Sequence, residues 1–306
     1  MNKKLIVRVA EGLGNQMFSY AAALSFAKLN NYELFIDSKS SYYKKKNIRD
    51  FNLNQFNLSG KIIKNELVYD NFYKNSLLKI CRKLDKFRKK KKFISEFKQK
   101  NKLTKYNKIY SKSLNNTVYM EGHYECEKYF LDIKDILIKE YILKDYKPNN
   151  NLENCIYKNR NGSVGIVLRQ NRFSERTGNR DAISKLKSYY FMKDQLNYIE
   201  RAVNFFKTKI NNPVFYVFSN FTNNLREYFD DNKFIIVNFQ GSPKNKMLHD
   251  YYHLSKMKNH IVSPSTFHWW PAWLNYKNQQ STLTVRPKNI NNSNNIDYWP
   301  SKWIKI

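Results

Sequence analysis

Hydroxyl side chains stand where a helix is expected to begin near the C-terminus. Ser263-Pro264-Ser265-Thr266 follows a short predicted strand over residues 260–262 and precedes a run in which Phe267, Trp270 and Leu274 recur at helical spacing. The first backbone N–H groups of a helix lack intrahelical partners, and the helix dipole favours negative charge there. Hydroxyls and N–H groups together attract phosphate, so this helix start is a candidate anion site.

One carboxylate precedes this segment on another predicted helix. Asp250 stands before Tyr251, Leu254 and Met257, whose spacing is that of one helix face. Its side chain can cap that helix, or it can turn its acceptor oxygens toward a ligand. The sequence leaves both roles open.

A glycine turn near the N-terminus offers a second anion site. Gly12-Leu13-Gly14-Asn15 follows the buried-strand pattern of residues 5–9 and opens a helical run that ends near Leu29. In a doubly wound fold such a turn lies at the carboxyl edge of the sheet, where the backbone can approach a diphosphate. A strand over residues 33–36 completes a βαβ unit, and Asp37 at its end is a candidate polar contact in a cleft.

The second half repeats the strand-and-helix pattern. A strand predicted over residues 163–168 leads into Arg169, and a continuously apolar strand over residues 214–218 ends at Ser219. Between the halves, Lys147-Pro148-Asn149-Asn150-Asn151 is a polar, proline-containing boundary. Alternating strands and helices predict an α/β fold with domains at residues 1–150 and 151–306.

The net charge of the chain favours certain classes of binding partner but does not select one of them. The 306 residues carry 55 Lys and Arg against 25 Asp and Glu, a formal charge of +30. Such a surface attracts nucleic acid, anionic lipid or phosphorylated substrates. An AT-rich coding bias toward Lys, Asn and Tyr explains the same composition equally well. The three cysteines show no pairing framework, which suits a reducing cytoplasm, and no segment approaches the ~20 apolar residues of a membrane span.

A basic amphipathic stretch lies within a predicted helical insert of the first domain, at about residues 74–113. Its apolar positions keep helical spacing, and they are Leu77, Ile80, Cys81, Leu84 and Phe87. The other face is basic except for Asp85. It is either a solvated helix face or a surface that docks onto anionic lipid. No helix-turn-helix, zinc or RNA-binding signature accompanies it, so we expect an anionic membrane surface as a partner and no nucleic acid.

Histidines at helical spacing raise the question of a metal. His249 and His253 stand at i and i+4, but the glutamate that follows the first histidine in zincins is absent. No Asp-x-Asp pair occurs to hold Mg²⁺ or Mn²⁺ on a diphosphate. We therefore expect neither a metal nor another cofactor.

Two signatures together resemble one enzyme family. Asp250 stands in register with Ser265-Thr266-Phe267, Trp269-Trp270 and Ala272-Trp273-Leu274, and residues 12–37 read GLGNQMFSYAAALSFAKLNNYELFID. Both segments resemble the bacterial α-1,2-fucosyltransferases of glycosyltransferase family 11. Pro264, His268 and Pro271 replace the Asn, Ser and Gly of the family pattern.

A third family block is only partly kept. The family pattern H-x-R-R-x-D falls on residues 167–172, where Val167 replaces the His and Arg169 keeps the first Arg. Gln170 replaces the second Arg, and Arg172 occupies the place of the acid. A guanidinium is a permanently charged, bidentate partner for a departing diphosphate, so the retained Arg169 is the essential position.

The resemblance implies a GT-B architecture, with two Rossmann-like domains facing a central cleft. It implies an inverting, metal-independent transfer of L-fucose from GDP-β-L-fucose to O2 of a galactose in a surface-glycan or lipid-linked oligosaccharide. Such an enzyme of O-antigen or capsule biosynthesis would sit on the inner face of the bacterial cytoplasmic membrane. The expected substrate-binding residues are Gly12, Gly14, Asn15, Arg169, Arg172, Ser219, Asp250, Ser265, Thr266 and His268.

Within this set, the resemblance implies that Asp250 binds the guanine and that Arg169 neutralises the β-phosphate. No general base stands out, and the candidates are Glu11, Asp37, His123 and Glu175. Two other functions stay open. One is a GT-B transferase with another GDP-sugar or linkage, and the other is a non-catalytic basic protein that binds nucleic acid or a lipid surface.

Overall fold

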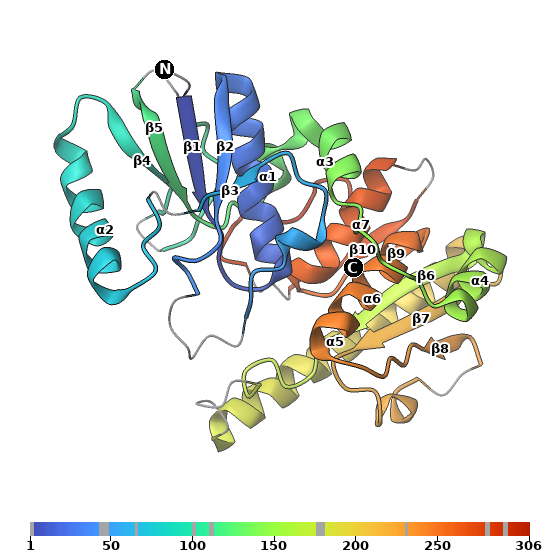
Figure 1. Ribbon diagram of the computed structural model, residues 1–306. Helices are drawn as coiled ribbons and strands as arrows, with labels where there is room; N and C mark the ends of the chain where they lie inside the picture. Colours follow the sequence, from blue (N-terminus) through green and yellow to red (C-terminus); the bar gives the residue numbers. More distant parts are fainter. Residues whose placement is uncertain are drawn as a thin grey trace. The chain divides into compact units, whose positions relative to one another are not determined.

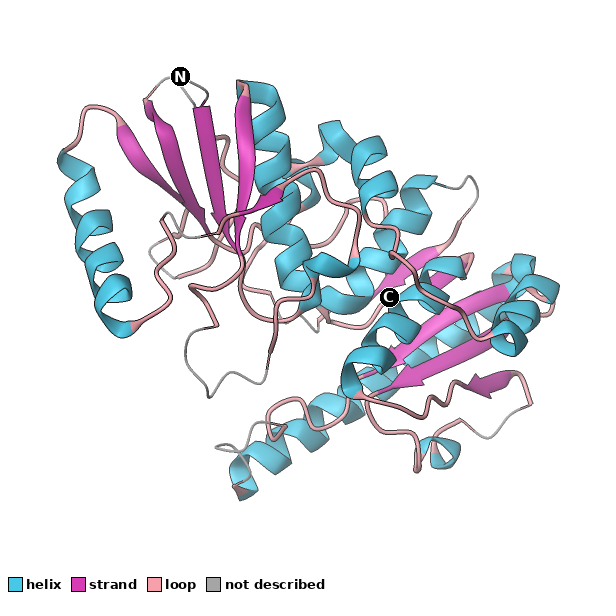
Figure 2. Ribbon diagram, viewed as in Figure 1, coloured by secondary structure: helices cyan, strands magenta, loops and turns pink. Residues whose placement is uncertain are grey.

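The computed structural model describes residues 3–42, 49–64, 67–99, 102–109, 113–175, 181–229, 232–278, 282–289 and 293–306. The chain forms two compact units, each built around its own sheet with helices beside it (Figures 1 and 2). The first unit comprises Met1–Lys144 and Ser293–Pro300, and the second comprises Asp145–Asn292 and Ser301–Ile306. This arrangement confirms the predicted α/β class.

The first sheet is parallel throughout its described pairings. Its strands are β1 Lys3–Arg8, β2 Tyr32–Asp37, β3 Lys61–Ile62, β4 Lys91–Ser95 and β5 Leu114–Glu121, in the order β3-β2-β1-β5-β4. The register sets Arg8 opposite both Asp37 and Glu121. Three charged side chains therefore meet at the carboxyl edge of this sheet.

The helices of this unit differ in how much of their surface is buried. Helix α1, Leu13–Asn30, is buried along most of its length, because small and apolar residues occupy all its faces. Helix α2, Phe72–Leu84, buries only Asn75 and Leu78, and helix α3, Lys134–Glu140, follows two short 3₁₀ turns. The predicted helical insert is only partly helical, because β4 within it pairs with β5 as an edge strand.

The second sheet is also parallel in its described pairings. Its strands are β6 Ser163–Leu168, β7 Val214–Ser219, β8 Phe234–Ile236, β9 Asn259–Ile261, β10 Thr284–Arg286 and β11 Ile304–Lys305, in the order β11-β10-β9-β6-β7-β8. Its helices are α4 Asn150–Lys158, α5 Ala182–Lys209, α6 Pro243–Lys256 and α7 Thr266–Asn278. Gly165 of β6 allows α6 to approach, since a Cβ there would lie 3.1 Å from the Leu254 side chain.

The last part of the chain departs from the expected domain division. Residues 293–300 return to the first unit, where Asp297 bonds Lys128 Nζ at 2.6 Å and accepts the Tyr106 N–H at 2.9 Å. Nothing in the local sequence marks this return.

No described helix is long and apolar enough to cross a membrane.

A buried histidine pair joins β9 to α7 inside the second unit. The Ser263 N–H donates to His268 Nδ1 at 3.2 Å, so the ring proton of His268 lies on Nε2 and donates to His260 Nδ1 at 3.3 Å. Neither ring is exposed. Burial lowers the pKa of His260 to about 3 and the pKa of His268 well below its usual value. Both imidazoles are therefore neutral near pH 7.

This pair predicts acid sensitivity. The folded-state pKa values lie below the unfolded value of about 6.5, so the stabilisation is complete above that pH and is lost as pH falls toward 3. We expect the free energy of unfolding to fall by about 2 kcal/mol between pH 7.5 and pH 5 from His260 alone, and His268 should add to the loss in the same direction. Urea unfolding, followed by tryptophan fluorescence at both pH values, measures the change.

The variant His268→Gln should show a smaller pH dependence than the wild type, because it removes one titrating ring. The matched control is His123→Gln, at an exposed position of the first unit, which should keep the wild-type dependence. Equal pH dependence in His268→Gln and the wild type would contradict the assignment.

Candidate functional site

The order of the second sheet defines where a ligand is expected. Strand β6 is central. The chain places β7 and β8 on one side of β6 and then β9, β10 and β11 on the other, so the strand order reverses at β6. Ligands of open α/β sheets bind at the carboxyl end of such a switch point. Arg169 follows β6 there, Ser219 ends β7 in register with Leu168, and Ser263 lies two residues past β9.

Arg169 is held firmly at this edge. Its N–H donates to Gln195 Oε1 at 3.2 Å, and its carbonyl accepts from Gln195 Nε2 at 2.9 Å. Gln195 belongs to α5 and is fully buried. Two bonds to one buried amide fix the backbone and so direct the guanidinium.

The Arg169 side chain belongs to a small ion cluster. Its guanidinium pairs with Glu175, whose other oxygen lies 3.7 Å from an Arg172 nitrogen. Two cations share one carboxylate, which leaves a net positive charge at the strand end. Among the described residues, the buried Nε of Arg169 has no hydrogen-bond partner. An unsatisfied buried N–H in a cationic cluster is a feature of an anion site.

Gln170, which replaces the second arginine of the family pattern, has a structural role. It is almost fully buried, and its Nε2 donates to Ser219 Oγ at 3.3 Å and to the Phe221 carbonyl at 3.0 Å. Its backbone exchanges two bonds with the Asn220 side chain. The amide therefore ties the end of β6 to the loop after β7 and turns the acceptor atom of Ser219 inward.

The start of α7 is built as the sequence indicates. Ser265 Oγ accepts the Phe267 N–H at 3.3 Å, which is a capping bond, and the Ser265 carbonyl accepts the Trp269 N–H at 3.1 Å. Thr266 is the first helical residue. His268, a predicted substrate contact, is instead buried and holds the Ser263 N–H, so its ring supports the turn that precedes the helix.

Asp250 does not cap its helix, so that interpretation is wrong. Helix α6 begins seven residues earlier at Pro243, and Ser242 caps it by accepting the Asn245 N–H at 3.2 Å. Asp250 lies inside the helix with Oδ2 bonded to Lys246 Nζ at 2.8 Å and Oδ1 3.1 Å from His249 Nδ1. The ligand role is the one that the geometry leaves open.

Beside Asp250, two imidazoles of α6 lie in contact with their ring planes tilted. His249 lies 4.3 Å from His253 and 4.7 Å from Phe239, measured between ring centroids. Burial lowers the pKa of His253 to about 4. Among the described residues, no group of three or more His, Cys, Asp or Glu side chains is placed to hold a metal ion.

The glycine turn of the first unit is fixed by a buried glutamine. Gln16 Nε2 donates to the carbonyls of Glu11 and Asp50 at 2.9 and 2.8 Å, and its Oε1 accepts the Asn52 N–H. Gly12 caps α1 in an extended conformation. Gly14 and Asn15 lie in the first turn of α1, with Gly14 buried and the Asn15 N–H bonded to the Gly12 carbonyl at 3.0 Å.

An arginine lies over this turn. A Cβ on Gly12 would lie 3.5 Å, an ordinary van der Waals distance, from a guanidinium nitrogen of Arg49, which places that cation against the turn. Its position beside a helix start makes it a further candidate for phosphate binding, which sequence spacing alone does not reveal.

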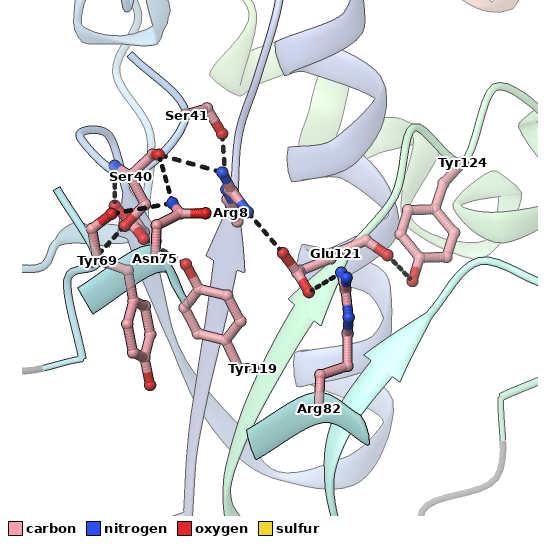
Figure 3. Close-up of polar contacts among 10 residues, drawn as sticks. Arg8, Ser40, Ser41, Tyr69, Asn75, Arg82, Tyr119, Glu121 and Tyr124 are labelled. Carbon is pink, nitrogen blue, oxygen red and sulfur yellow. Dashed lines mark hydrogen bonds and ion pairs between the residues drawn. The ribbon is translucent and has the colours of Figure 1, made fainter. Parts of the chain in front are cut away.

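Two arginines and a glutamate form a hydrogen-bonded network at the carboxyl edge of the first sheet (Figure 3). Arg8 bonds Glu121 at 2.8 Å and Ser41 Oγ at 2.9 Å, and Arg82 of α2 bonds the other Glu121 oxygen at 3.1 Å. Arg8 and Glu121, the charged residues at the ends of β1 and β5, are the sequence signal of this network, which the predicted site did not include.

Asp37 is buried beneath the network. It accepts the N–H groups of Lys39 and Ser40 at 3.1 and 3.0 Å and the Tyr119 hydroxyl. Burial, then the nearby Asp37 charge, raises the pKa of Tyr119, which therefore stays a donor. These bonds argue against Asp37 as a substrate contact or general base.

The other three base candidates are placed differently. Glu11 is exposed, and its φ of 62° is a left-handed conformation that is strained for a residue with a side chain. His123 is exposed, with its backbone N–H bonded to Glu96. Glu175 is engaged by the arginines, so Glu11 is the carboxylate best placed at the glycine turn.

Comparison with known proteins supplies the family. The model of glycosyl transferase family 11 matches residues 1–306. An alpha-1,2-colitosyltransferase of Escherichia coli is 28% identical, over 99% of this chain and 98% of its own. The O-antigen biosynthesis glycosyltransferase WbnK of Escherichia coli is 27% identical, over 94% and 97%.

Two solved structures share the fold at low sequence identity. The fucosyltransferase NodZ from Bradyrhizobium superposes with a TM-score of 0.51 at 13% identity, covering 90% of this chain and 93% of its own. A variant of Arabidopsis thaliana FUT1 in complex with GDP gives 0.51 at 14% identity, covering 94% and 71%. Since the family model spans the whole sequence, the chain belongs to glycosyl transferase family 11 and is a glycosyltransferase.

Proposed function

We propose that the protein transfers L-fucose from GDP-β-L-fucose, with inversion at C1, to O2 of a galactose in a surface-glycan or lipid-linked oligosaccharide. The observation that carries the proposal is the cluster at the end of β6. Arg169 and Arg172 share Glu175 there, and the Nε–H of Arg169 is buried without a partner among the described residues. This arrangement suits a diphosphate, whose oxygens satisfy several N–H donors at once.

At C1 the reaction makes one bond and breaks one. The acceptor oxygen attacks C1, its proton passes to a base, and the bond from C1 to the β-phosphate oxygen breaks with its electron pair leaving on GDP. Arg169 and Arg172 neutralise that charge as it develops. The capped start of α7 at Ser265 and Thr266 is a further site for the diphosphate. The glycine turn of the first unit is an anion site in its own right.

Asp250 is proposed to read the guanine. Its two oxygens can accept from N1–H and the 2-amino group, and Lys246 and His249 hold its orientation. Arg169 and Asp250 then bind opposite ends of GDP. We propose that no metal is required, because the arginines supply the positive charge that a divalent cation supplies elsewhere.

The name of one relative favours a second donor. The Escherichia coli alpha-1,2-colitosyltransferase suggests colitose, which differs from L-fucose in lacking the 3-hydroxyl group. Transfer assays with GDP-fucose, GDP-colitose and GDP-mannose, each with excess chelator, separate the candidates. Preference for GDP-fucose without metal supports the proposal, whereas preference for another donor overturns it.

Salt-sensitive DNA binding stronger than GDP binding would favour a non-catalytic function.

Replacing Arg169 by Ala should lower turnover at least ~100-fold, because one charge-stabilising donor is lost. The steady-state rate with GDP-fucose measures this loss, and Arg169→Lys should recover part of it. The control is Arg201→Ala, an exposed arginine of α5 that bonds its own helix, which should keep normal turnover. Near-normal turnover in Arg169→Ala would refute the role.

Replacing Asp250 by Ala should weaken binding of GDP far more than binding of inorganic diphosphate, because only GDP carries the guanine. Competition titrations with both ligands measure the difference. The control Asp194→Ala changes an exposed carboxylate of α5 and should leave both affinities intact. Equal losses for the two ligands in Asp250→Ala would exclude guanine reading.

Replacing Glu11 by Gln should lower turnover about 100-fold, because general bases contribute on that scale, and should leave GDP affinity unchanged. The acidic limb of the pH–rate profile should disappear with it. Glu127→Gln, in the same unit, serves as the control. A wild-type pH–rate profile in Glu11→Gln would show that Glu11 is not the base.

A further inference from the structure

Helix α2 presents its apolar side chains outward. Tyr73, Leu77, Ile80 and Leu84 stand at steps of three or four residues and share one stripe, which Phe87 continues. Their exposed fractions are 83%, 55%, 55%, 51% and 76%. The sequence pattern identified the amphipathic stretch, but it could not show that the apolar side, rather than the basic one, faces away from the sheet.

Positive charge borders this stripe, here called the α2 stripe. The exposed bases around it are Lys79, Lys83, Lys86, Arg88, Lys89 and Lys90. Lys86 Nζ lies 4.8 Å from the centroid of the Phe87 ring. Two acids lie nearby. Asp85 is buried, accepts the N–H groups of Lys92 and Phe93 and lies 3.6 Å from an Arg88 nitrogen, and Asp70 pairs with Lys74 at 3.1 Å, so the lysines around the stripe keep an excess of positive charge.

The inner side of α2 is tied to the carboxyl edge of the first sheet. Leu78 packs with Ile6 and Tyr119. Asn75 donates to the Ser40 carbonyl at 3.4 Å, and Arg82 bonds Glu121 at 3.1 Å, which are contacts drawn in Figure 3. These contacts anchor α2 to that edge, so whatever α2 binds lies beside the edge.

We propose that the α2 stripe docks in the plane of an anionic bilayer, and that this docking brings the edge of the first sheet to a lipid-linked acceptor. An apolar stripe bordered by lysines is the pattern of interfacial helices, in which the apolar side chains enter the headgroup boundary and the lysines bind anionic headgroups. The identity of the acceptor rests on the proposed transferase function, whereas bilayer binding does not.

The same surface fits other occupants less well. A second copy packed through a two-fold axis would bring the same lysines close to one another, and like charges across an interface are unfavourable. Nucleic acid would use the lysines and leave most of the aliphatic stripe in water. Of these three occupants, a bilayer is the one that matches both the charge and the apolar area.

Flotation with vesicles tests the docking. The full chain should bind phosphatidylcholine vesicles that contain phosphatidylglycerol, and should bind pure phosphatidylcholine weakly. Replacing Lys83, Lys89 and Lys90 by Gln should reduce partitioning by about fivefold per residue, or roughly 100-fold together. Lys91 is left unchanged, because its Nζ bonds the carbonyls of Asp85 and Lys86.

The apolar part is tested separately. Replacing Leu77, Ile80 and Leu84 by Ser should reduce partitioning at least about tenfold with little effect on folding, since each is more than half exposed. Two control triples change equally exposed positions elsewhere. They are Lys28, Lys139 and Lys158 to Gln, and Leu29, Ile142 and Ile296 to Ser.

Three results would overturn the docking proposal. They are wild-type partitioning in either α2 triple, equal losses in the control triples, and DNA binding that depends on the lysines while vesicle binding does not. Sedimentation that shows a dimer dissociated by the Leu77, Ile80 and Leu84 changes would assign the stripe to a second copy instead.

The acceptor is tested with one oligosaccharide in two forms, soluble and lipid-anchored in anionic vesicles. The α2 triples should keep the soluble rate and lose at least about tenfold on the anchored form. Equal rates on both forms would refute the acceptor inference. If the wild type binds vesicles but transfers fucose to neither form, the proposed function fails and the docking stands.

Discussion

Parallel strand pairing is the constraint on which the rest of the structure depends. In a parallel sheet every strand ends at the same edge, so residues far apart in the chain meet there. In the first unit this brings Arg8 between Asp37 and Glu121, and in the second it brings Arg169 beside Ser219. Charged and hydroxyl groups gather at these edges because strand order and register place them there.

Buried amides then convert an edge into a defined site. Gln16, Gln170 and Gln195 are each nearly inaccessible to solvent. The side-chain amide of each one donates to a backbone carbonyl in a loop that follows a strand. Such bonds are costly to leave unmade, so they hold the loops in one conformation. The positions of Gly12 and Arg169 follow from these bonds.

The sequence predicted the α/β class, most strands and the start of α7 near Thr266, because period and turn chemistry are local signals. It did not predict that α6 begins at Pro243, since the residues before Asp250 carry no apolar period and the signal is the Ser242-Pro243 pair. Nor did it predict the burial of Asp37 and His268, because burial depends on which distant side chains fill the neighbouring space. Gln170 is the clearest case, since only contacts with the loop after β7 explain it.

The return of residues 293–300 to the first unit bears on how the chain is made. Tyr298 is buried there, with its ring centroid 6.2 Å from that of Phe18. Domains usually fold in order of synthesis. Here the first unit lacks part of its own interior until residues 293–300 have left the ribosome, so its core is completed only after strands β6 to β10 of the second unit have been made, and a chain cut short before residue 293 would leave Phe18 partly uncovered.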